Sequence, residues 1–198
     1  MVYNEILKRE IPEEWEMKSL YEIANITMGQ SPEGSSYNEN KKGIIFFQGS
    51  TDFGWRFPLN RVYTTKPTRF AEENDILLSV RAPVGTINLA IERCCIGRGL
   101  CAINSKDGFN SFLIYQIEYF KYKFDYLNFI GTTFGSLTKD DLYNLKLSYP
   151  AKEILKNFEK IVNNWDKQVK LNTKQIHHLQ SLRDTLLPML MNGQIEIE

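Results

Sequence analysis

The pattern of apolar positions divides the chain near residue 150. From Leu155 to Leu190, apolar residues recur at alternating spacings of three and four, with Asn172 and Arg183 as polar exceptions. This repeat is typical of a helix that buries one narrow stripe against another helix. It predicts a coiled-coil dimerisation helix over residues 151–192 and a tail at 193–198, with Pro188 and Gly193 marking the end of the helix. The predicted seam consists of Leu155, Phe158, Val162, Trp165, Val169, Asn172, Ile176, Leu179, Leu186 and Leu190.

The predicted length of this helix exceeds the width of the domain that precedes it. At about 1.5 Å per residue, the stretch from Leu155 to Leu187 spans about 48 Å. A compact domain of about 150 residues is narrower than that, so we expect much of the helix to project and to need a partner. Asn172 lies midway along the seam, where a polar residue can fix the register of a dimer. The alternative is that Asn172 is simply tolerated, because it lies at a solvent-exposed edge of the seam.

Residues 1–150 show short apolar runs separated by glycine and proline. Strands are predicted at 44–47, 61–64, 76–80, 86–91 and 100–103. Helices are predicted at 18–26 and 109–124. A third short helix is predicted after Thr138, and a strand ends at Pro150. The spacings Ser19 to Glu22 and Thr138 to Asp141 fit capping boxes. The fold class predicted for residues 1–150 is therefore mixed α/β (α+β).

Composition narrows the protein class. The chain has 198 residues, 42% of them hydrophobic, which is enough for a real core. It has no apolar run of about 18 residues and no apolar leader, so we expect neither a membrane span nor a secretion signal. Its three cysteines, Cys94, Cys95 and Cys101, are odd in number and close together. This favours free thiols in a reducing cytoplasm over a disulfide framework.

Charge is balanced in total but not along the chain. The sequence holds 24 basic and 24 acidic residues. Residues 1–40 hold 3 basic and 8 acidic residues, whereas residues 41–101 hold 9 basic and 5 acidic ones. A local basic surface is sufficient to bind phosphate even when the net charge is zero. The alternative is that these charges only keep the surface solvated.

Glycine-rich turns and polar loops in the same region suggest DNA binding. Arginine and lysine neutralise phosphates, and amide, hydroxyl and guanidinium groups read base edges. Taken singly, each such residue is also an ordinary turn or surface residue. The candidate DNA-binding residues are Gln30, Ser31, Ser35, Tyr37, Gln48, Ser50, Thr51, Arg56, Lys66, Arg69, Arg81, Arg98, Thr132 and Thr133.

Signs of catalysis or of a metal site are weak. There is no Asn-Pro-Pro or Asp-Pro-Pro motif, and the Gly-Arg-Gly at 97–99 lacks the continuation of a cofactor loop. The Glu-x-Lys triplets at 16–18 and 39–41 do not follow acidic residues at a spacing that suits a nuclease. The three cysteines, with His177 and His178, do not have zinc-site spacing. The sequence therefore predicts no metal and no cofactor bound by this chain.

Five sequence segments, in their order and spacing, match those of a known protein family. They are "IPEEWEMKSLYEIANITMGQSP", "DILLSVRAPVGTINLA", "CCIGRGLCAI", "GTTFGSLTKDDLYNLKLSYP" and "LRDTLLPMLMNGQI". Together they cover nearly the whole chain, which resembles one target-recognition half of a type I restriction-modification specificity subunit. The resemblance implies a non-catalytic subunit with two recognition domains, each followed by a long helix, and with the two helices antiparallel. Each domain would read a few base pairs of a bipartite site in double-stranded DNA.

The same resemblance implies partners. Modification subunits would carry S-adenosylmethionine and methylate adenine N6, with or without restriction subunits. This chain departs from the pattern in having one domain and one helix, so it is either a natural half-subunit that forms a homodimer or an excised half. The heptad seam favours the homodimer, which would read a gapped palindrome. Two alternatives stay open: a stand-alone DNA-modifying or DNA-cleaving enzyme, and an antirestriction decoy without sequence preference.

Overall fold

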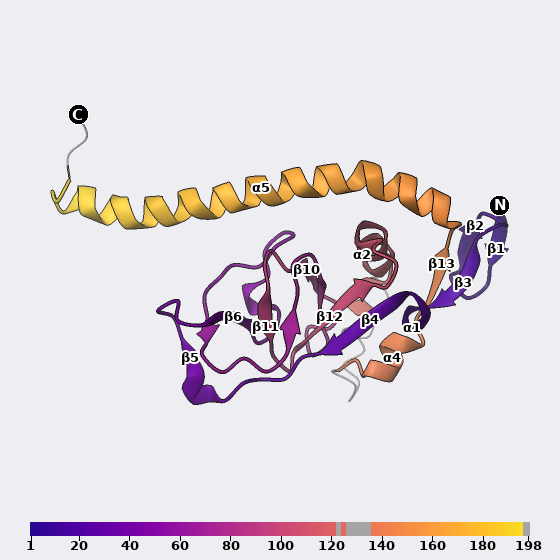
Figure 1. Ribbon diagram of the computed structural model, residues 1–198, viewed down its shortest axis with the longest axis horizontal. Coiled ribbons are helices and arrows are strands. Elements are labelled where there is room, and N and C mark those ends of the chain that lie inside the picture. Colours follow the sequence, from indigo (N-terminus) through magenta and orange to yellow (C-terminus); the bar gives the residue numbers. More distant parts are fainter. Residues whose placement is uncertain (122–123, 126–135, 196–198) are drawn as a thin grey trace.

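Two main β-sheets form the body of residues 1–150, and the long helix α5 (Lys152–Met191) lies along one side of it (Figure 1). The computed structural model describes residues 1–121, 124–125 and 136–195. The first sheet is antiparallel, with its four strands in the order β10 (Ile87–Leu89), β9 (Ile76–Ser79), β12 (Leu100–Ser105) and β4 (Ala24–Met28). The second sheet has five strands, in the order β5 (Tyr37–Asn38), β7 (Tyr63–Thr64), β6 (Ile44–Phe47), β11 (Cys94–Ile96) and β8 (Phe70–Ala71), and β6 pairs with β11 in parallel.

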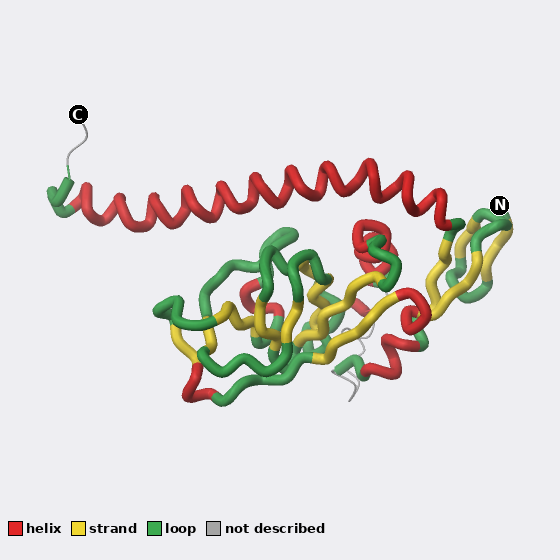
Figure 2. Tube along the Cα trace, in the orientation of Figure 1, coloured by secondary structure: helices red, strands yellow, loops and turns green. Residues whose placement is uncertain are grey.

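Smaller elements surround these sheets (Figure 2). The hairpin of β1 (Val2–Asn4) and β2 (Arg9–Ile11) precedes a two-stranded pairing of β3 (Glu16–Ser19) with β13 (Lys146–Tyr149). The short helices are α1 (Leu20–Ile23), α2 (Asn110–Tyr119) and α4 (Lys139–Tyr143), with single 3-10 turns at η1 (Gly34–Ser36) and η2 (Ser50–Asp52). The pairing of β3 with β13 brings the two ends of the domain together and places the start of α5 beside α2.

The alternation of side chains along the central strands divides the core in two. From β9 and β12, Leu77 and Ala102 face the five-stranded sheet and pack with Phe47 and Ile96. Their sequence neighbours in the same strands point the other way, toward α2, α4 and the start of α5. Both faces of the four-stranded sheet are therefore covered, which explains the nearly continuous apolar runs of β9 and β12.

The sequence predicted the class of the fold and most of its elements. The mixed α/β domain followed by a long helix is confirmed. So are the strands at 44–47, 76–80, 86–91 and 100–103, each within a few residues of its predicted bounds, whereas the run at 61–64 is a strand only at Tyr63–Thr64. Helix 109–124 is confirmed over Asn110–Tyr119. The strands β1 to β5, β8 and β11 were not predicted, because their runs are short or carry helix signals.

Both capping boxes are confirmed, but the first helix is shorter than predicted. The Glu22 carboxylate accepts a hydrogen bond from the Ser19 backbone N–H at 2.6 Å. In α4, the Asp141 carboxylate accepts from the Thr138 backbone N–H at 2.8 Å, and the Thr138 hydroxyl accepts from the Asp141 backbone N–H at 3.2 Å. The prediction of a helix over 18–26 was wrong after Ile23, because the next residues pair with β12 as strand β4.

Helix α5 runs unbroken over 40 residues. The prediction that Pro188 helps to end it was wrong, since the helix continues to Met191 and turns at Gly193, whose φ is +66°. A proline removes one backbone hydrogen bond. Pro188 is exposed and lies in the last turn but one, where water can satisfy the carbonyl group that is left. None of the described helices is long and apolar enough to span a membrane.

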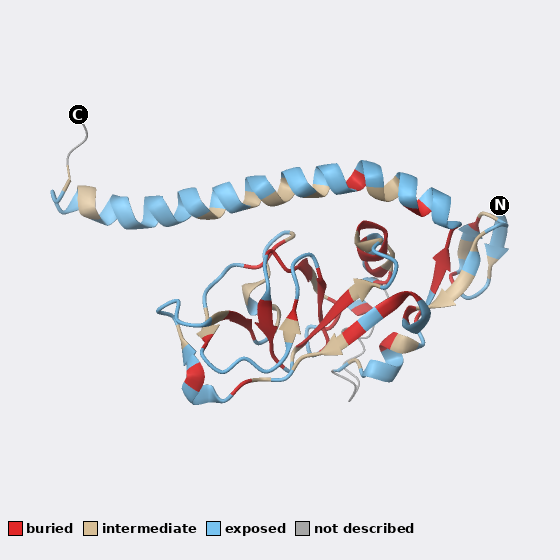
Figure 3. Ribbon diagram, in the orientation of Figure 1, coloured by how far each residue is buried: buried red, intermediate tan, exposed pale blue. Residues whose placement is uncertain are grey.

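The first half of α5 packs on the domain and the second half does not. Leu155 and Val162 are buried, and Phe158 and Val169 are half-buried against the same core. Figure 3 shows the buried positions of α5 only near its N-terminal end. The domain and the start of α5 thus share one core. A smaller part of the helix projects from the domain than its length alone suggested. Seam positions further along the helix, such as Ile176 and Leu179, are exposed.

Candidate nucleic-acid interface

Three loops from distant parts of the chain meet around one shallow pocket of about 250 Å³. They follow β6, β9 and β11, and they bring together five of the predicted residues. The lining comprises Gln48, Gly49, Ser50, Thr51, Arg81, Ala82, Pro83, Arg98 and Gly99. Two guanidinium groups, an amide and two hydroxyls therefore lie around one opening, which is the set of groups that binds phosphates and base edges.

Backbone hydrogen bonds hold these loops together. The Gly97 N–H donates to the Phe47 carbonyl at 2.8 Å, and the Gly99 N–H donates to the Gln48 carbonyl at 3.1 Å. The Val80 N–H donates to the Gly99 carbonyl at 2.9 Å. A Cβ at Gly99 would lie 2.6 Å from the Gln48 carbonyl oxygen, which no side chain tolerates. The glycines on either side of Arg98 thus allow these loops to approach one another closely.

Ser31 ties the end of β4 to the same site. Its hydroxyl donates to the Gln48 side-chain oxygen at 3.0 Å and accepts from the Arg98 backbone N–H at 3.2 Å. Next to it, the Gln30 backbone N–H donates to the Ile96 carbonyl at 3.0 Å, and the Gln30 side chain is exposed. The amide of Gln48 is therefore oriented before any ligand arrives.

The surface extends from Gln48 toward Tyr37. A second pocket, of about 130 Å³, shares Gln48, Gly49 and Thr51 with the first and adds Tyr37 and Arg61, among others. The Tyr37 ring packs on Phe46 with centroids 4.7 Å apart, and its hydroxyl donates to the Pro32 carbonyl at 2.9 Å. Arg61 was not among the predicted residues. No local motif marked it, and its guanidinium pairs with Asp52 at 2.8 Å.

The cations of this region differ in how far they are neutralised. Among the described residues, Arg81 and Arg98 take part in none of the ion pairs, and both are exposed. Lys66, in contrast, donates to Glu33 at 2.7 Å, and this bond lowers the pKa of the Glu33 carboxyl. Arg69 is exposed near β11, where its carbonyl accepts from the Ile96 N–H at 2.9 Å. Arg69 likewise takes part in none of the ion pairs of the described residues, but Arg81 and Arg98 bring two unpaired positive charges to one pocket.

Other predicted residues lie apart from this cluster. Ser35 donates to Glu33 at 2.8 Å, beside Lys66. Arg56 is 12% exposed, and its guanidinium pairs with Asp166 of α5 at 2.6 Å, so it joins the helix to the domain. We therefore leave Arg56 out of the interface. Thr132 and Thr133 lie outside the described residues.

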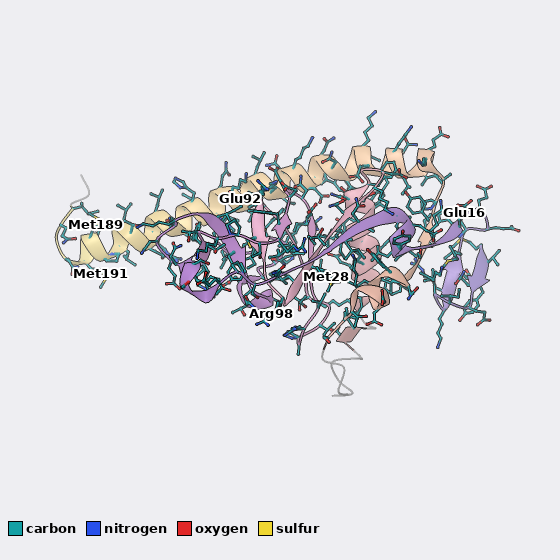
Figure 4. The ribbon with its side chains drawn as sticks, turned by 60° about the horizontal axis from the view of Figure 1, so that its bottom comes forward. Glu16, Met28, Glu92, Arg98, Met189 and Met191 are labelled. Atoms are coloured by element: carbon teal, nitrogen blue, oxygen red, sulfur yellow. The ribbon has the colours of Figure 1, made fainter. Side chains whose placement is uncertain are left out.

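The cluster faces away from α5. In Figure 4, Arg98 is labelled at the lower edge of the domain, whereas α5 runs along the upper edge. A ligand at the three loops would thus approach the domain from the side opposite to the docked helix.

The cysteines and histidines do not join this site. All three cysteines are free and buried, and burial raises the pKa of Cys94 and of Cys101 to about 12. Within the described ranges, no three His, Cys, Asp or Glu side chains gather as a metal site would require. His177 and His178 lie on α5 near Lys41 and Tyr63, along the opening between the helix and the domain.

Comparison with known proteins gives a consistent match over nearly the whole chain. The family model described as "Type I restriction modification DNA specificity domain" matches residues 12–181. The putative type I restriction enzyme MjaX specificity subunit of Methanocaldococcus jannaschii is 37% identical over 193 residues, or 96% of this chain and 45% of the relative. The type I restriction enzyme MjaIX specificity subunit of the same organism is 29% identical, over 100% of this chain and 48% of the relative. The chain thus spans about half the length of the curated relatives it matches.

Solved structures agree with this match. The crystal structure of the HsdS subunit from Thermoanaerobacter tengcongensis superimposes with a TM-score of 0.67 at 32% identity, covering 94% of this chain and 47% of that one. A chain from a structure described as "Structural basis underlying complex assembly and conformational transition of the type I R-M system" gives a TM-score of 0.68 at 34% identity, covering 91% of this chain and 46% of that one.

Proposed function

The chain belongs to the type I restriction-modification DNA specificity family, and on that premise we propose that it is a non-catalytic module that recognises a DNA sequence. The observation that carries the proposal is the meeting of Gln48, Thr51, Arg81 and Arg98 around one exposed pocket. Arg81 and Arg98 would neutralise phosphates and fix the orientation of the duplex. The pre-oriented Gln48 amide and the hydroxyls beside it would read base edges in the major groove.

We propose that this module acts within a larger assembly. Its relatives are named as specificity subunits of type I restriction enzymes. The chemistry would then belong to modification subunits, which bring S-adenosylmethionine and methylate adenine, with or without restriction subunits. The reduced, buried cysteines suit the cytoplasm, where we expect the assembly to work.

We further propose that two copies pair through the exposed part of the α5 seam. Trp165, Ile176, Leu179 and Leu186 are all exposed, although they are large and apolar. Such a row of apolar side chains on one helix favours a helical partner. A two-fold dimer would present two identical interfaces, so the target would be a palindrome with a nonspecific gap. Replacing both Ile176 and Leu179 by Asp should leave a folded monomer; a dimer that persists in sedimentation equilibrium would show that the seam is elsewhere.

The decisive experiment is methylome sequencing of cells that carry this chain with its modification subunit. We expect one gapped, palindromic adenine motif that disappears when the chain is deleted. Methylation that is independent of the chain would overturn the proposal. Turnover of DNA by the purified chain without another protein would indicate an enzyme instead. Binding that is equal on all sequences would indicate a decoy.

The interface itself is tested with single arginine variants on DNA that carries the motif. Arg81→Ala and Arg98→Ala should each reduce the slope of log K against log salt by about 0.9, the value of one lost phosphate contact. Arg93→Ala is the matched control, because Arg93 is also exposed but pairs with Glu72 at 3.0 Å. Equal effects of all three substitutions would mean that binding depends only on total charge.

A further inference from the structure

A polar joint holds α5 against the recognition domain. The Arg56 guanidinium pairs with the Asp166 carboxylate at 2.6 Å, and these side chains are only 12% and 20% exposed. One helical turn further on, the Lys170 ammonium pairs with Glu73 at 2.5 Å and donates to the Asn74 side-chain oxygen at 3.0 Å. Its side chain is also 12% exposed. The Glu73 side chain is 59% exposed, so only the Arg56–Asp166 pair is shielded on both sides and screened less by solvent than a surface pair.

A third contact belongs to the same joint. The Ser111 backbone N–H, in the first turn of α2, donates to the Glu159 carboxylate at 3.2 Å. Positions 159, 166 and 170 share one face of α5 and span about 16 Å of its axis. Their partners come from three separate segments: the loop after η2, the turn between β8 and β9, and α2. The joint therefore fixes the helix against three elements at once.

The joint adds to the apolar packing along this stretch, where Val162 is buried and Val169 is half-buried against the core. A cavity of about 270 Å³ lies between the helix and the domain, lined by Glu73, Glu159, Asp166 and Lys170 together with residues of α2 and β10. Among the described residues, the Glu159 Oε2 and Arg56 Nε atoms are buried without a hydrogen-bond partner. A polar cavity of this size has room for water. Ion pairs thus act together with the apolar contacts of Phe158, Val162 and Val169 in determining where the helix lies here.

We propose that Arg56, Asp166 and Lys170 are positioning residues that set the angle at which α5 leaves the domain, and hence the gap between two DNA half-sites. The inference rests on the proposed function. Helix α5 continues from Thr173 to Met191, about 27 Å beyond the joint. A tilt of about 10° at the joint would move the far end by about 5 Å, more than the rise of about 3.4 Å per base pair. A change at the joint would therefore alter which gap length fits.

The test uses the full chain with its modification subunit on DNA in which two half-sites are separated by gaps that differ by one base pair. The wild type should favour one gap length. In Arg56→Ala and Asp166→Asn, that preference should fall by roughly tenfold, while affinity for a single half-site stays within about twofold, because both residues lie outside the DNA interface. The charge swap of Arg56→Asp with Asp166→Arg should restore part of the preference. Arg93→Ala again serves as the control, since its ion pair lies within the domain.

A gap preference that survives in both single variants would overturn the proposal. If either variant unfolds, Lys170→Met tests the same joint through a different pair. A second readout needs no DNA: spin labels at Lys139→Cys and Met191→Cys report the position of the helix end, with excess unlabelled chain added so that only distances within one chain count. A narrow distance distribution that stays equally narrow in Asp166→Asn would also refute the joint. If the wild type shows no sequence preference but the distribution broadens in the variant, the proposed function fails and the joint stands.

Discussion

Truncating one leucine in the first half of the α5 seam and one in the second half should have different effects on stability. Leu155 is 0% exposed and belongs to the main core, whereas Leu179 is 62% exposed. Truncating a fully buried leucine to alanine costs about 2–5 kcal/mol, from lost burial plus the cavity left behind. In a protein of this size, 1 kcal/mol corresponds to about 2–4 °C in Tm, so Leu155→Ala should lower Tm by about 4–20 °C. Leu179→Ala should change the stability of the monomer by no more than about 0.5 kcal/mol.

Thermal unfolding followed by far-UV circular dichroism measures both effects, and a series of protein concentrations separates folding from association. Leu155→Ala should lower Tm at every concentration. Leu179→Ala should match the wild type when dilute and fall below it only where the wild type is dimeric. The reasoning fails if Leu155→Ala costs less than about 1 kcal/mol, because the start of α5 would then not share the core of the domain. It also fails if dilute Leu179→Ala loses as much stability as Leu155→Ala.

The remaining predictions concern local interactions. Burial raises the pKa of Cys94 and Cys101 to about 12, so these thiols should react with a thiol reagent at pH 8 only after denaturant is added. The pKa of an unfolded thiol lies near its ordinary value of 9.0, whereas the folded thiols stay protonated to a higher pH, so the stability that their burial provides should be lost as the pH rises from about 9 toward 12. Thr138→Ala removes the cap of α4 and should cost about 1 kcal/mol in urea unfolding, whereas an unchanged midpoint would show that the cap is not needed. The Lys170 ammonium lowers the pKa of the Glu73 carboxyl from its ordinary value of 4.5, so wild type should be more stable than Glu73→Gln at neutral pH and lose that advantage as the pH falls below about 4.5.

Local signals in the sequence predicted local structure well. The three-four repeat predicted α5, and residue spacing predicted the capping boxes at Ser19 and Thr138, because each depends on neighbours within one or two helical turns. Strand β4 shows the limit of such signals. Its residues follow a capping box and were read as helix, but pairing with β12 outweighs the local preference.

The candidate interface could be predicted only as separate residues. Gln48, Arg81 and Arg98 were each identified as polar groups in loops. Their meeting depends on the parallel register of β6 with β11, a long-range pairing that no local pattern encodes. Arg56 shows the opposite case: an arginine in a polar loop near these residues pairs instead with a residue more than a hundred positions later. Residue type alone does not distinguish an exposed side chain of the candidate interface from one that pairs with α5.

The split of the α5 seam has a geometric cause. A stripe that repeats every 3.5 residues drifts by about 20° per heptad around a straight helix of 3.6 residues per turn. Between Leu155 and Leu190, five heptads apart, the drift amounts to about 100°. The first seam residues therefore face their own domain, while Ile176 and Leu179 have turned toward solvent. Asp166 and Lys170 bind the domain near the middle of the helix, where the stripe passes from one side to the other. One uninterrupted repeat can thus serve two partners in succession, first the domain that precedes it and then the second copy proposed here.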